Sequence, residues 1–506
     1  MTDAAHRPNV LLLMADQLSA SWLPSYGHTV VSSPAVDRLA ADAVVFENAY
    51  CPSPLCAPSR ASMLTGRLPS RTGVYDNAAD MRPSLPTLAH HLRAAGYRTC
   101  LSGKMHFVGP DQLHGFEERL TTDIYPGDLD WTPDWRLPMK DRYSWYHTMD
   151  SVQYPARCRA SMPMDYDDEV AFQAVRKIYD FARDPDNTPF FLTASFTHPH
   201  DPWELRSEYW DRYDLADIPD PTVPRIPLDD ADAHSRRLRE MFGADEVQLG
   251  DEQVRKARHG YYAAVSYVDA RIGELLDALD DSGLADDTIV VLTSDHGEML
   301  GERGLWYKMS FYEHSARVPL MIRVPGRTPR RVEAPVSLLD LAPTVVDLSG
   351  VTPDRLDVDG MTLAPLVDGR RADRGAPVVA EYLAEGVTAP AVMVRNERFK
   401  LIRCPGDPDL LYDLATDPDE LDNLAGSCAY AGTLDTLGAE VESRWDLGEL
   451  DNRVRGSQLD RLVVAPALTR GIRTDWDFCP YLDGSSVYVR SHTNMYELQR
   501  RSRMEV

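Results

Sequence analysis

Four short apolar runs along the chain end in polar or ionisable side chains. The first run ends at Asp16, and the last ends at Asp295 and His296. Continuous apolar runs of this length are typical of parallel strands that are buried on both faces. Ligand sites in open parallel sheets lie at the carboxyl ends of strands, so the four ends predict one shared site. The four runs are residues 9–16, 97–106, 190–200 and 288–296.

Helical patterns alternate with these runs. Residues 85–95 show apolar positions at helical spacing and stop at Gly96, and residues 251–281 form a long amphipathic candidate. A third helix can open just after Cys56, with Pro58 in its first turn. The alternation predicts an α/β fold with a mostly parallel sheet flanked by helices.

The pattern changes near residue 370. Two short strand-like pieces, residues 391–395 and 399–403, flank a polar turn and predict an antiparallel hairpin. We therefore expect a large α/β domain over residues 1–370 and a smaller C-terminal subdomain over residues 371–506.

Composition narrows the possible partners. The chain of 506 residues is 43% hydrophobic and carries a formal net charge of −26. Such a charge disfavours nucleic acid and anionic membranes, and suits a zwitterionic or cationic ligand better. No run approaches the roughly 18 apolar residues that a membrane helix needs, and the first residues lack a basic, cleavable leader, so we expect a cytoplasmic protein. The seven cysteines fit no disulfide framework and no zinc spacing.

The most informative motif covers residues 56–67. Cys56, Pro58, Ser59 and Arg60 form Cys-x-Pro-Ser-Arg, and Leu-Thr-Gly-Arg follows one helical turn later. This block resembles the signature of the type I sulfatases, members of the alkaline phosphatase superfamily. The resemblance implies a fold with a large, mostly parallel sheet and a small antiparallel sheet near the C-terminus. It also implies that a formylglycine-generating enzyme oxidises Cys56 to an aldehyde. In that family one hydroxyl of the hydrated aldehyde attacks sulfur and the other later expels sulfate.

The resemblance also implies a site for one divalent cation. Its carboxylate ligands suit a hard cation, with Ca²⁺ expected first and Mg²⁺ or Mn²⁺ as alternatives. The second of the two adjacent carboxylates that sulfatases usually have is a glutamine here, as in some branches of the family. The implied ligands are Asp16, Gln17, the modified Cys56, Asp295 and His296.

Family matching assigns the catalytic roles as well. Arg60 would hold the aldehyde hydrate, and Asn77 would join the sulfate contacts. Either His200 or Lys308 would protonate the leaving oxygen. His198 ranks below His200 as a candidate for substrate binding, because a His-Pro-His turn more often lies exposed at the surface than in a catalytic site. The implied sulfate-binding and proton-transfer residues are Lys104, His106, His200 and Lys308.

Several further stretches are similar to the choline sulfatases. That resemblance implies choline sulfate as substrate, with its trimethylammonium group held by aromatic faces and carboxylates. Trp131, His147 and Glu385 match the positions that line this pocket. The C-terminal end departs from the subfamily pattern, and only Glu497 remains acidic there. The similar stretches are residues 50–56, 101–117, 123–126 and 301–308.

Two other functions stay open at this point. The same core motifs fit an aryl or alkyl sulfatase, or a phosphonate or phosphate ester hydrolase of the superfamily. A catalytically inactive ligand-binding member is the third possibility, although the intact Cys56, Asp16 and Lys104 argue against it. The resemblance further implies a homo-oligomer, a dimer or a tetramer, in which the C-terminal tail is used for assembly.

Overall fold

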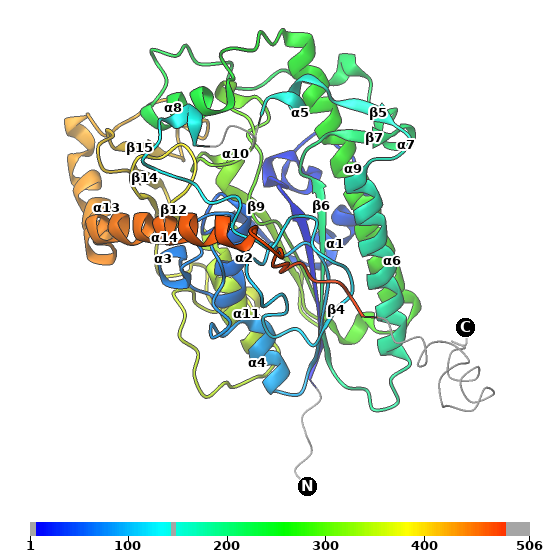
Figure 1. Cartoon of the computed structure of the whole chain (residues 1–506). Helices are drawn as coiled ribbons and strands as arrows, with labels where there is room; N and C mark the ends of the chain where they lie inside the picture. Colours follow the sequence, from blue (N-terminus) through cyan, green and yellow to red (C-terminus); the bar gives the residue numbers. More distant parts are fainter. Residues whose placement is uncertain (1–6, 143–147, 482–506) are drawn as a thin grey trace.

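The computed structural model describes residues 7–142 and 148–481. A nine-stranded mixed sheet forms its centre, with the strand order β10-β2-β9-β8-β1-β6-β3-β4 and β11 pairing with β2 (Figure 1). The strands are β1 (Asn9–Asp16), β2 (Val44–Tyr50), β3 (Arg98–Gly103), β4 (Glu118–Arg119), β6 (Phe190–Pro199), β8 (Thr288–Thr293), β9 (Arg317–Arg323), β10 (Arg330–Val332) and β11 (Val336–Ser337).

The four predicted apolar runs are neighbours in this sheet. Strands β8, β1, β6 and β3 lie side by side and run parallel, so that Leu13 of β1 pairs with Ala194 of β6 and Leu292 of β8. Every residue of β1 and β6 is buried, which explains why these runs are apolar throughout. The predicted mostly parallel α/β fold is confirmed.

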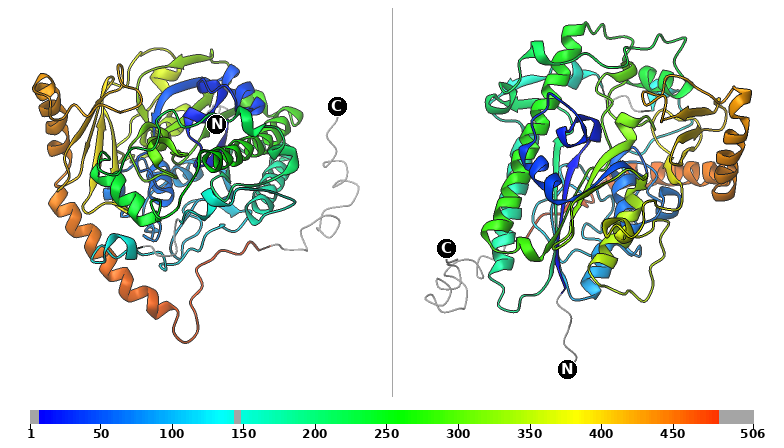
Figure 2. Two further views of the ribbon diagram at one scale, coloured as in Figure 1. Left: turned by 90° about the horizontal axis from the view of Figure 1, so that it is seen from above. Right: turned by 180° about the vertical axis from the view of Figure 1, so that it is seen from behind.

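Helices cover both faces of the sheet. Helices α6 and α9 pack together on one face, and α2, α4 and α11 cover the other, as the front and rear views show (Figures 1 and 2). Helix α9 has the predicted bounds. Helix α4 begins three residues later than predicted, because Thr87 caps it and accepts a hydrogen bond from the His90 amide. These helices are α2 (Cys56–Thr65), α4 (Leu88–Ala94), α6 (Met162–Ala182), α9 (Asp251–Asp281) and α11 (Leu341–Leu348).

A second sheet of four antiparallel strands follows in the order β12-β13-β14-β15. The predicted hairpin is its β13-β14 pair, in which Val394 faces Leu401. The amide of Glu381 donates to the Pro52 carbonyl at 2.9 Å, so this sheet is attached directly to the main domain. The division at residue 370 stays a prediction. The strands are β12 (Val378–Tyr382), β13 (Ala391–Arg395), β14 (Phe399–Arg403) and β15 (Leu410–Asp413).

The remaining elements are short, apart from the two C-terminal helices. Helix α14 extends from the second sheet across the front of the molecule, past α2 and α3 (Figure 1). In the described part of the chain, no helix combines the length and the apolar character needed to cross a membrane. The other elements are α1 (Pro34–Asp42), α3 (Pro69–Thr72), α5 (Asp150–Gln153), α7 (Ser207–Trp210), α8 (Ala233–Phe242), α10 (Glu313–Ala316), α12 (Ala364–Val367), α13 (Ala431–Arg444), α14 (Leu447–Leu468), and the paired strands β5 (Ala156–Cys158) and β7 (Glu204–Arg206).

Candidate active site

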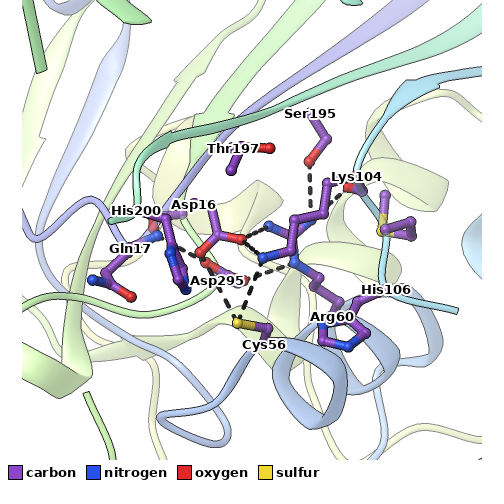
Figure 3. A network of polar contacts seen from close by, with 12 residues as sticks. Asp16, Gln17, Cys56, Arg60, Lys104, His106, Ser195, Thr197, His200 and Asp295 are labelled. Atoms are coloured by element: carbon purple, nitrogen blue, oxygen red, sulfur yellow. Dashed lines mark hydrogen bonds and ion pairs between the residues drawn. The ribbon is translucent and has the colours of Figure 1, made fainter. Parts of the chain in front are cut away.

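Four buried side chains meet where the parallel strands end. Asp16 is the last residue of β1, Asp295 and His296 follow β8, and Cys56 is the first residue of α2. One potential ligand atom from each lies within 4.8 Å of the others. We call this group the acid–cysteine cluster, and Figure 3 shows Asp16, Cys56 and Asp295 of it. The convergence of distant strand ends that the sequence predicted is confirmed for these residues.

Arg60 connects residues that lie in or directly after all four parallel strands. Its Nε lies 2.7 Å from Asp295 Oδ2 and its Nη2 lies 3.0 Å from Asp16 Oδ2. Its Nη1 donates to the Lys104 carbonyl at 2.6 Å and to Ser195 Oγ at 2.9 Å. The side chain is fully buried, and a buried guanidinium requires this complete set of acceptors. Arg60 therefore fixes the two cluster carboxylates relative to the strands beside them.

Lys104 lies on the other side of Asp16. Its ammonium forms an ion pair with the Asp16 carboxylate, lies 3.7 Å from Cys56 Sγ and sits 4.3 Å from the centre of the Tyr125 ring. Burial opposes ionisation of Asp16, but the positive charges of Lys104 and Arg60 hold its pKa well below the ordinary value. The cluster therefore keeps its negative carboxylates at neutral pH.

The Cys56 thiol is not activated as a nucleophile. Burial, and then the charge of Asp16, raise its pKa to about 12 despite Lys104. A neutral thiol is a poor nucleophile, and reactive cysteines usually have lowered pKa values. The Cys56 position itself is favourable for an anion, because it lies at a helix N-terminus. The amide of Ala57 in that first turn is held by Asn77 Oδ1 at 3.0 Å.

A second set of polar groups adjoins the cluster. Lys308 Nζ donates to Gln17 Oε1 at 2.7 Å and lies 2.7 Å from His200 Nε2. Burial, and then the charge of Lys308, lower the pKa of His200 to about 4. Neutral His200 thus accepts from Lys308. Gln17 Nε2 donates to Glu298 at 2.6 Å, so its amide is oriented by Glu298 and Lys308, and its role as a metal ligand stays a prediction.

His106 faces aromatic residues. Its ring lies 5.3 Å from that of Tyr125 and 5.8 Å from that of Trp131, between ring centres. The residue has a positive φ of 57°, and Asp123 holds this conformation by accepting from the His106 amide at 2.8 Å. Burial, and then Lys104, lower the pKa of His106 to about 3. The imidazole of His106 is therefore neutral, and it lies between the acid–cysteine cluster and the rings of Tyr125 and Trp131.

Glu385 comes from the turn after β12. It is buried, and the Tyr382 hydroxyl donates to its Oε2 at 3.0 Å. Burial raises its pKa to about 7, and the negative charge of Asp76 adds to this rise. A carboxylate with this pKa changes its charge close to neutral pH.

The His198 side chain contacts the helices that cover the sheet. Its Nδ1 lies 2.7 Å from the Asp167 carboxylate of α6, and its ring packs on Tyr267 of α9 with 4.7 Å between ring centres. These contacts are made with the helices that cover the sheet, so they give no support to substrate binding. Two other predicted residues, His147 and Glu497, lie outside the described residues.

Sequence reasoning did not find four side chains that organise the site. Ser195 and Asp123 hold Arg60 and His106, while Tyr125 and Tyr382 contact Lys104 and Glu385. Ser195 and Tyr125 lie in stretches that were already conspicuous, yet nothing in their local sequence indicates a contact with a residue from another strand or loop.

The cluster fits a divalent cation. Its donor set is two carboxylates, one imidazole nitrogen and one sulfur position, all buried. His296 Nδ1 lies 3.1 Å from the Gly297 carbonyl, which indicates that it carries the proton and that Nε2 turns its lone pair toward the cluster. Burial lowers the pKa of His296 to about 4, so the ring is neutral as a ligand must be.

Comparison with known families agrees with this geometry. Residues 8–351 match the sulfatase family model. Residues 301–445 match the model for the C-terminal part of N-sulphoglucosamine sulphohydrolase, and residues 452–504 match the model for the C-terminal part of choline sulfatase.

Individual relatives extend the similarity to nearly the whole chain. A choline-sulfatase of Rhizobium meliloti is 46% identical over 505 residues, which is 98% of each chain. An arylsulfatase of Clostridium perfringens is 29% identical, over 85% of this chain and 93% of the relative. The crystal structure of a phosphonate monoester hydrolase of Agrobacterium radiobacter superposes with a TM-score of 0.71 at 26% identity, covering 89% of this chain and 96% of that one.

Proposed function

We propose that this chain, which belongs to the sulfatase family, hydrolyses choline sulfate to choline and inorganic sulfate. The observation that carries the proposal is the 46% identity to a choline-sulfatase over 98% of both chains, together with the match of residues 452–504 to the choline sulfatase C-terminal model. The intact acid–cysteine cluster argues against the inactive ligand-binding alternative.

The sulfate end of the substrate binds beside Cys56. Lys104, Lys308 and Arg60 bring positive charge to this point, and Asn77 lies beside the first turn of α2. Fixed positive groups in a buried site stabilise the charge of a transferring sulfuryl group far better than they would in water. The sulfate end thus needs no contribution from the overall charge of −26, which is repulsive for anions.

Asp16, Asp295, His296 and the modified Cys56 would hold one divalent cation, and we expect Ca²⁺ because two of these four residues are carboxylates, which suit a hard cation. When bound, this cation supplies Lewis-acid charge beside the nucleophile. Gln17 is a further candidate ligand through its amide oxygen.

The raised pKa of the Cys56 thiol fits a precursor of formylglycine better than a thiolate nucleophile. A thiol with a pKa of about 12 would be a poor nucleophile, but its carbon skeleton is well placed at the start of α2. The side chain is 1% exposed, so a formylglycine-generating enzyme must reach it before folding is complete. The modified residue, as a hydrate, supplies the attacking oxygen, and Arg60 and Lys104 hold that position.

Proton transfer to the departing alcohol is assigned to Lys308 and His200. Their nitrogens lie 2.7 Å apart, and the pKa of His200 is about 4, so at neutral pH the lysine carries the shared proton. An alkyl alcohol is a poor leaving group, and protonating its oxygen as the bond breaks lowers the barrier.

The cationic end of choline sulfate binds toward Tyr125, Trp131 and Glu385. Tyr125 and Trp131 pack together with 5.3 Å between ring centres, beside His106. Aromatic faces and a carboxylate attract a trimethylammonium group, which offers no ordinary hydrogen bond. His147 and Glu497 stay predicted members of this pocket.

Assembly and compartment stay predictions. A homo-oligomer is supported by exposed apolar side chains on α14: Leu459 is 43% exposed, Val463 75% and Val464 42%. Light scattering with size-exclusion chromatography gives the oligomeric state directly. The cytoplasmic compartment is tested by fractionation of cells that express the protein.

Sulfate release from choline sulfate by the purified protein tests the proposal. We expect equimolar choline and sulfate, and none from Cys56→Ala prepared in parallel. A nitrophenyl sulfate and a phosphonate monoester should be poorer substrates. Preferential cleavage of either would instead support the aryl sulfatase or the phosphonate hydrolase alternative.

A further inference from the structure

The C-terminal segment runs along the loop that carries Trp131. We call residues 125–135 the aromatic loop. Gln458 Oε1 of α14 accepts from the Trp135 amide at 3.1 Å, and Ala465 packs against Leu129. After the helix, Asp477 Oδ1 accepts from the Gly127 amide at 3.0 Å. As the C-terminal segment advances from residue 458 to 477, its contacts move back along the loop from residue 135 to 127, so the two segments are antiparallel neighbours.

Arg461 is the buried charge at the centre of this contact. Its two Nη atoms each lie 2.7 Å from a different oxygen of Asp76, in a bidentate pair that is almost completely buried. Its Nη1 also lies 3.4 Å from Thr132 Oγ1, the residue after Trp131. A bidentate arginine–carboxylate pair fixes orientation as well as distance. Arg461 thus touches both the aromatic loop and the turn at Asp76.

The turn at Asp76 leads directly to the active site. Asp76 Oδ1 accepts from the Ala78 amide at 3.0 Å, and Asn77 between them holds the Ala57 amide at 3.0 Å, next to Cys56. The position of this turn therefore sets where Asn77 stands beside the first residue of α2.

We infer that Arg461 and Gln458 of α14 are positioning residues for the substrate pocket, which hold the aromatic loop and the Asp76 turn and thereby set the selectivity among sulfate esters. Neither residue belongs to the acid–cysteine cluster. They act through the residues they hold, which are Trp135, Thr132 and Asp76, and this inference rests on the proposed function.

The geometry explains why a helix so late in the chain is needed. Gln458 is 2% exposed and Arg461 4% exposed, although α14 lies across the outside of the molecule in Figure 1. Polar side chains are rarely buried at an exposed helix unless they have specific partners. Here the partners are the aromatic loop and the Asp76 turn. A helix face that made only apolar packing contacts would not need the buried amide of Gln458 or the buried guanidinium of Arg461.

Two variants test the inference, Arg461→Met and Gln458→Met. Steady-state kcat and KM are measured for choline sulfate and for 4-nitrophenyl sulfate, which has no cationic end. We expect Gln458→Met to raise the KM for choline sulfate about tenfold and to change the KM for the aryl ester less than about threefold. Arg461→Met also releases the Asp76 turn beside Asn77, so it should raise both KM values, with the larger rise for choline sulfate. Arg461→Lys, which keeps the positive charge but loses the bidentate geometry, should give an intermediate ratio.

The matched control is Arg444→Met on α13, which removes an exposed ion pair with Glu440 and should leave both substrates unchanged. A role limited to stability would lower the active fraction and thus kcat for both esters by one factor, with the ratio of kcat/KM values intact. That result, or an unchanged KM for choline sulfate, overturns the inference. If Arg461→Met does not fold, Gln458→Met gives the same test from the loop side.

Failure of the proposed function is distinguishable. It would be seen in the wild-type protein as an absence of choline sulfate cleavage. The positioning role would then be tested on the best substrate from a panel of sulfate esters, with 4-nitrophenyl sulfate as the reference and the same expected loss of selectivity.

Discussion

The acid–cysteine cluster stands at the ends of β1 and β8 and the start of α2, whereas the aromatic loop lies outside the sheet. Arg60 touches residues in or directly after all four parallel strands, and every member of the cluster is buried. The aromatic loop is held instead by Gln458 and Asp477, more than 300 residues later in the chain. The cluster is thus positioned by the sheet and α2, whereas the aromatic loop is positioned by a C-terminal segment that crosses the surface.

The difference separates chemistry from substrate choice. The cluster residues, which we propose as nucleophile precursor and metal ligands, are positioned by the ends of β1 and β8 and by the start of α2. The groups that would face the non-sulfate end depend on loops and on α14, which can change without disturbing the strands. Changes at the cluster should therefore affect every sulfate ester, while changes at the aromatic loop should affect esters selectively.

The largest effect is expected from Cys56→Ala. Without the precursor of the nucleophile, turnover of choline sulfate and of aryl sulfates should fall at least about 10⁴-fold. The thermal unfolding temperature should change little, because only the small polar end of one side chain is lost. Residual activity within tenfold of wild type on either ester would rule out Cys56 as the nucleophile precursor.

Asp295→Asn should be the next most damaging change. It removes one negative ligand and leaves Arg60 without its 2.7 Å carboxylate partner. Metal affinity should fall at least about 100-fold, with parallel losses of activity on both esters. Metal content measured by mass spectrometry after gel filtration checks this. An unchanged metal-to-protein ratio would contradict the ligand assignment, and Asp451→Asn on α14 serves as a control for loss of one carboxylate away from the cluster.

The sequence predicted the convergence of the strand ends at the acid–cysteine cluster, because the motifs that indicate each strand and the helix at Cys56 are local. Each strand is a continuous apolar run with its chemistry at the end, and the helix at Cys56 opens on a distinctive motif. The contacts between the aromatic loop and α14 have no such local motif. Nothing in the local sequence of Gln458 or Arg461 indicates their contacts, because their partners Trp135 and Asp76 are separated from them by hundreds of residues. His198 is the reverse case, because a residue beside a predicted site contacts the covering helices instead.

Trp131→Ala should separate the two ends of the site. Loss of a desolvated cation–π contact of about 2 kcal/mol raises the KM for choline sulfate by a factor on the order of ten or more. The KM for 4-nitrophenyl sulfate should change less than about threefold, since that ester presents no cation. Equal impairment of both esters would show that Trp131 supports the fold of the loop and does not contact the ammonium group.

A smaller effect is expected from pH. Glu385 has a pKa of about 7, raised by burial, so it is neutral below that value and negative above it. The KM for choline sulfate should fall about three- to fivefold as pH rises from about 6 to 8, because the ionised carboxylate attracts the cation. Glu385→Gln should remove this dependence, and the aryl ester should not show it in either protein. A pH profile that Glu385→Gln leaves unaltered would assign the titration to another group.

The most direct test of the two-ended site is a competition in one vessel. Wild-type protein is given equal, low concentrations of choline sulfate and 4-nitrophenyl sulfate, and the consumption of each ester is followed by mass spectrometry. The ratio of the two rates equals the ratio of the kcat/KM values. If the aromatic loop and Glu385 recognise the trimethylammonium group, choline sulfate should be consumed at least about tenfold faster. Equal or faster consumption of the aryl ester would contradict the account.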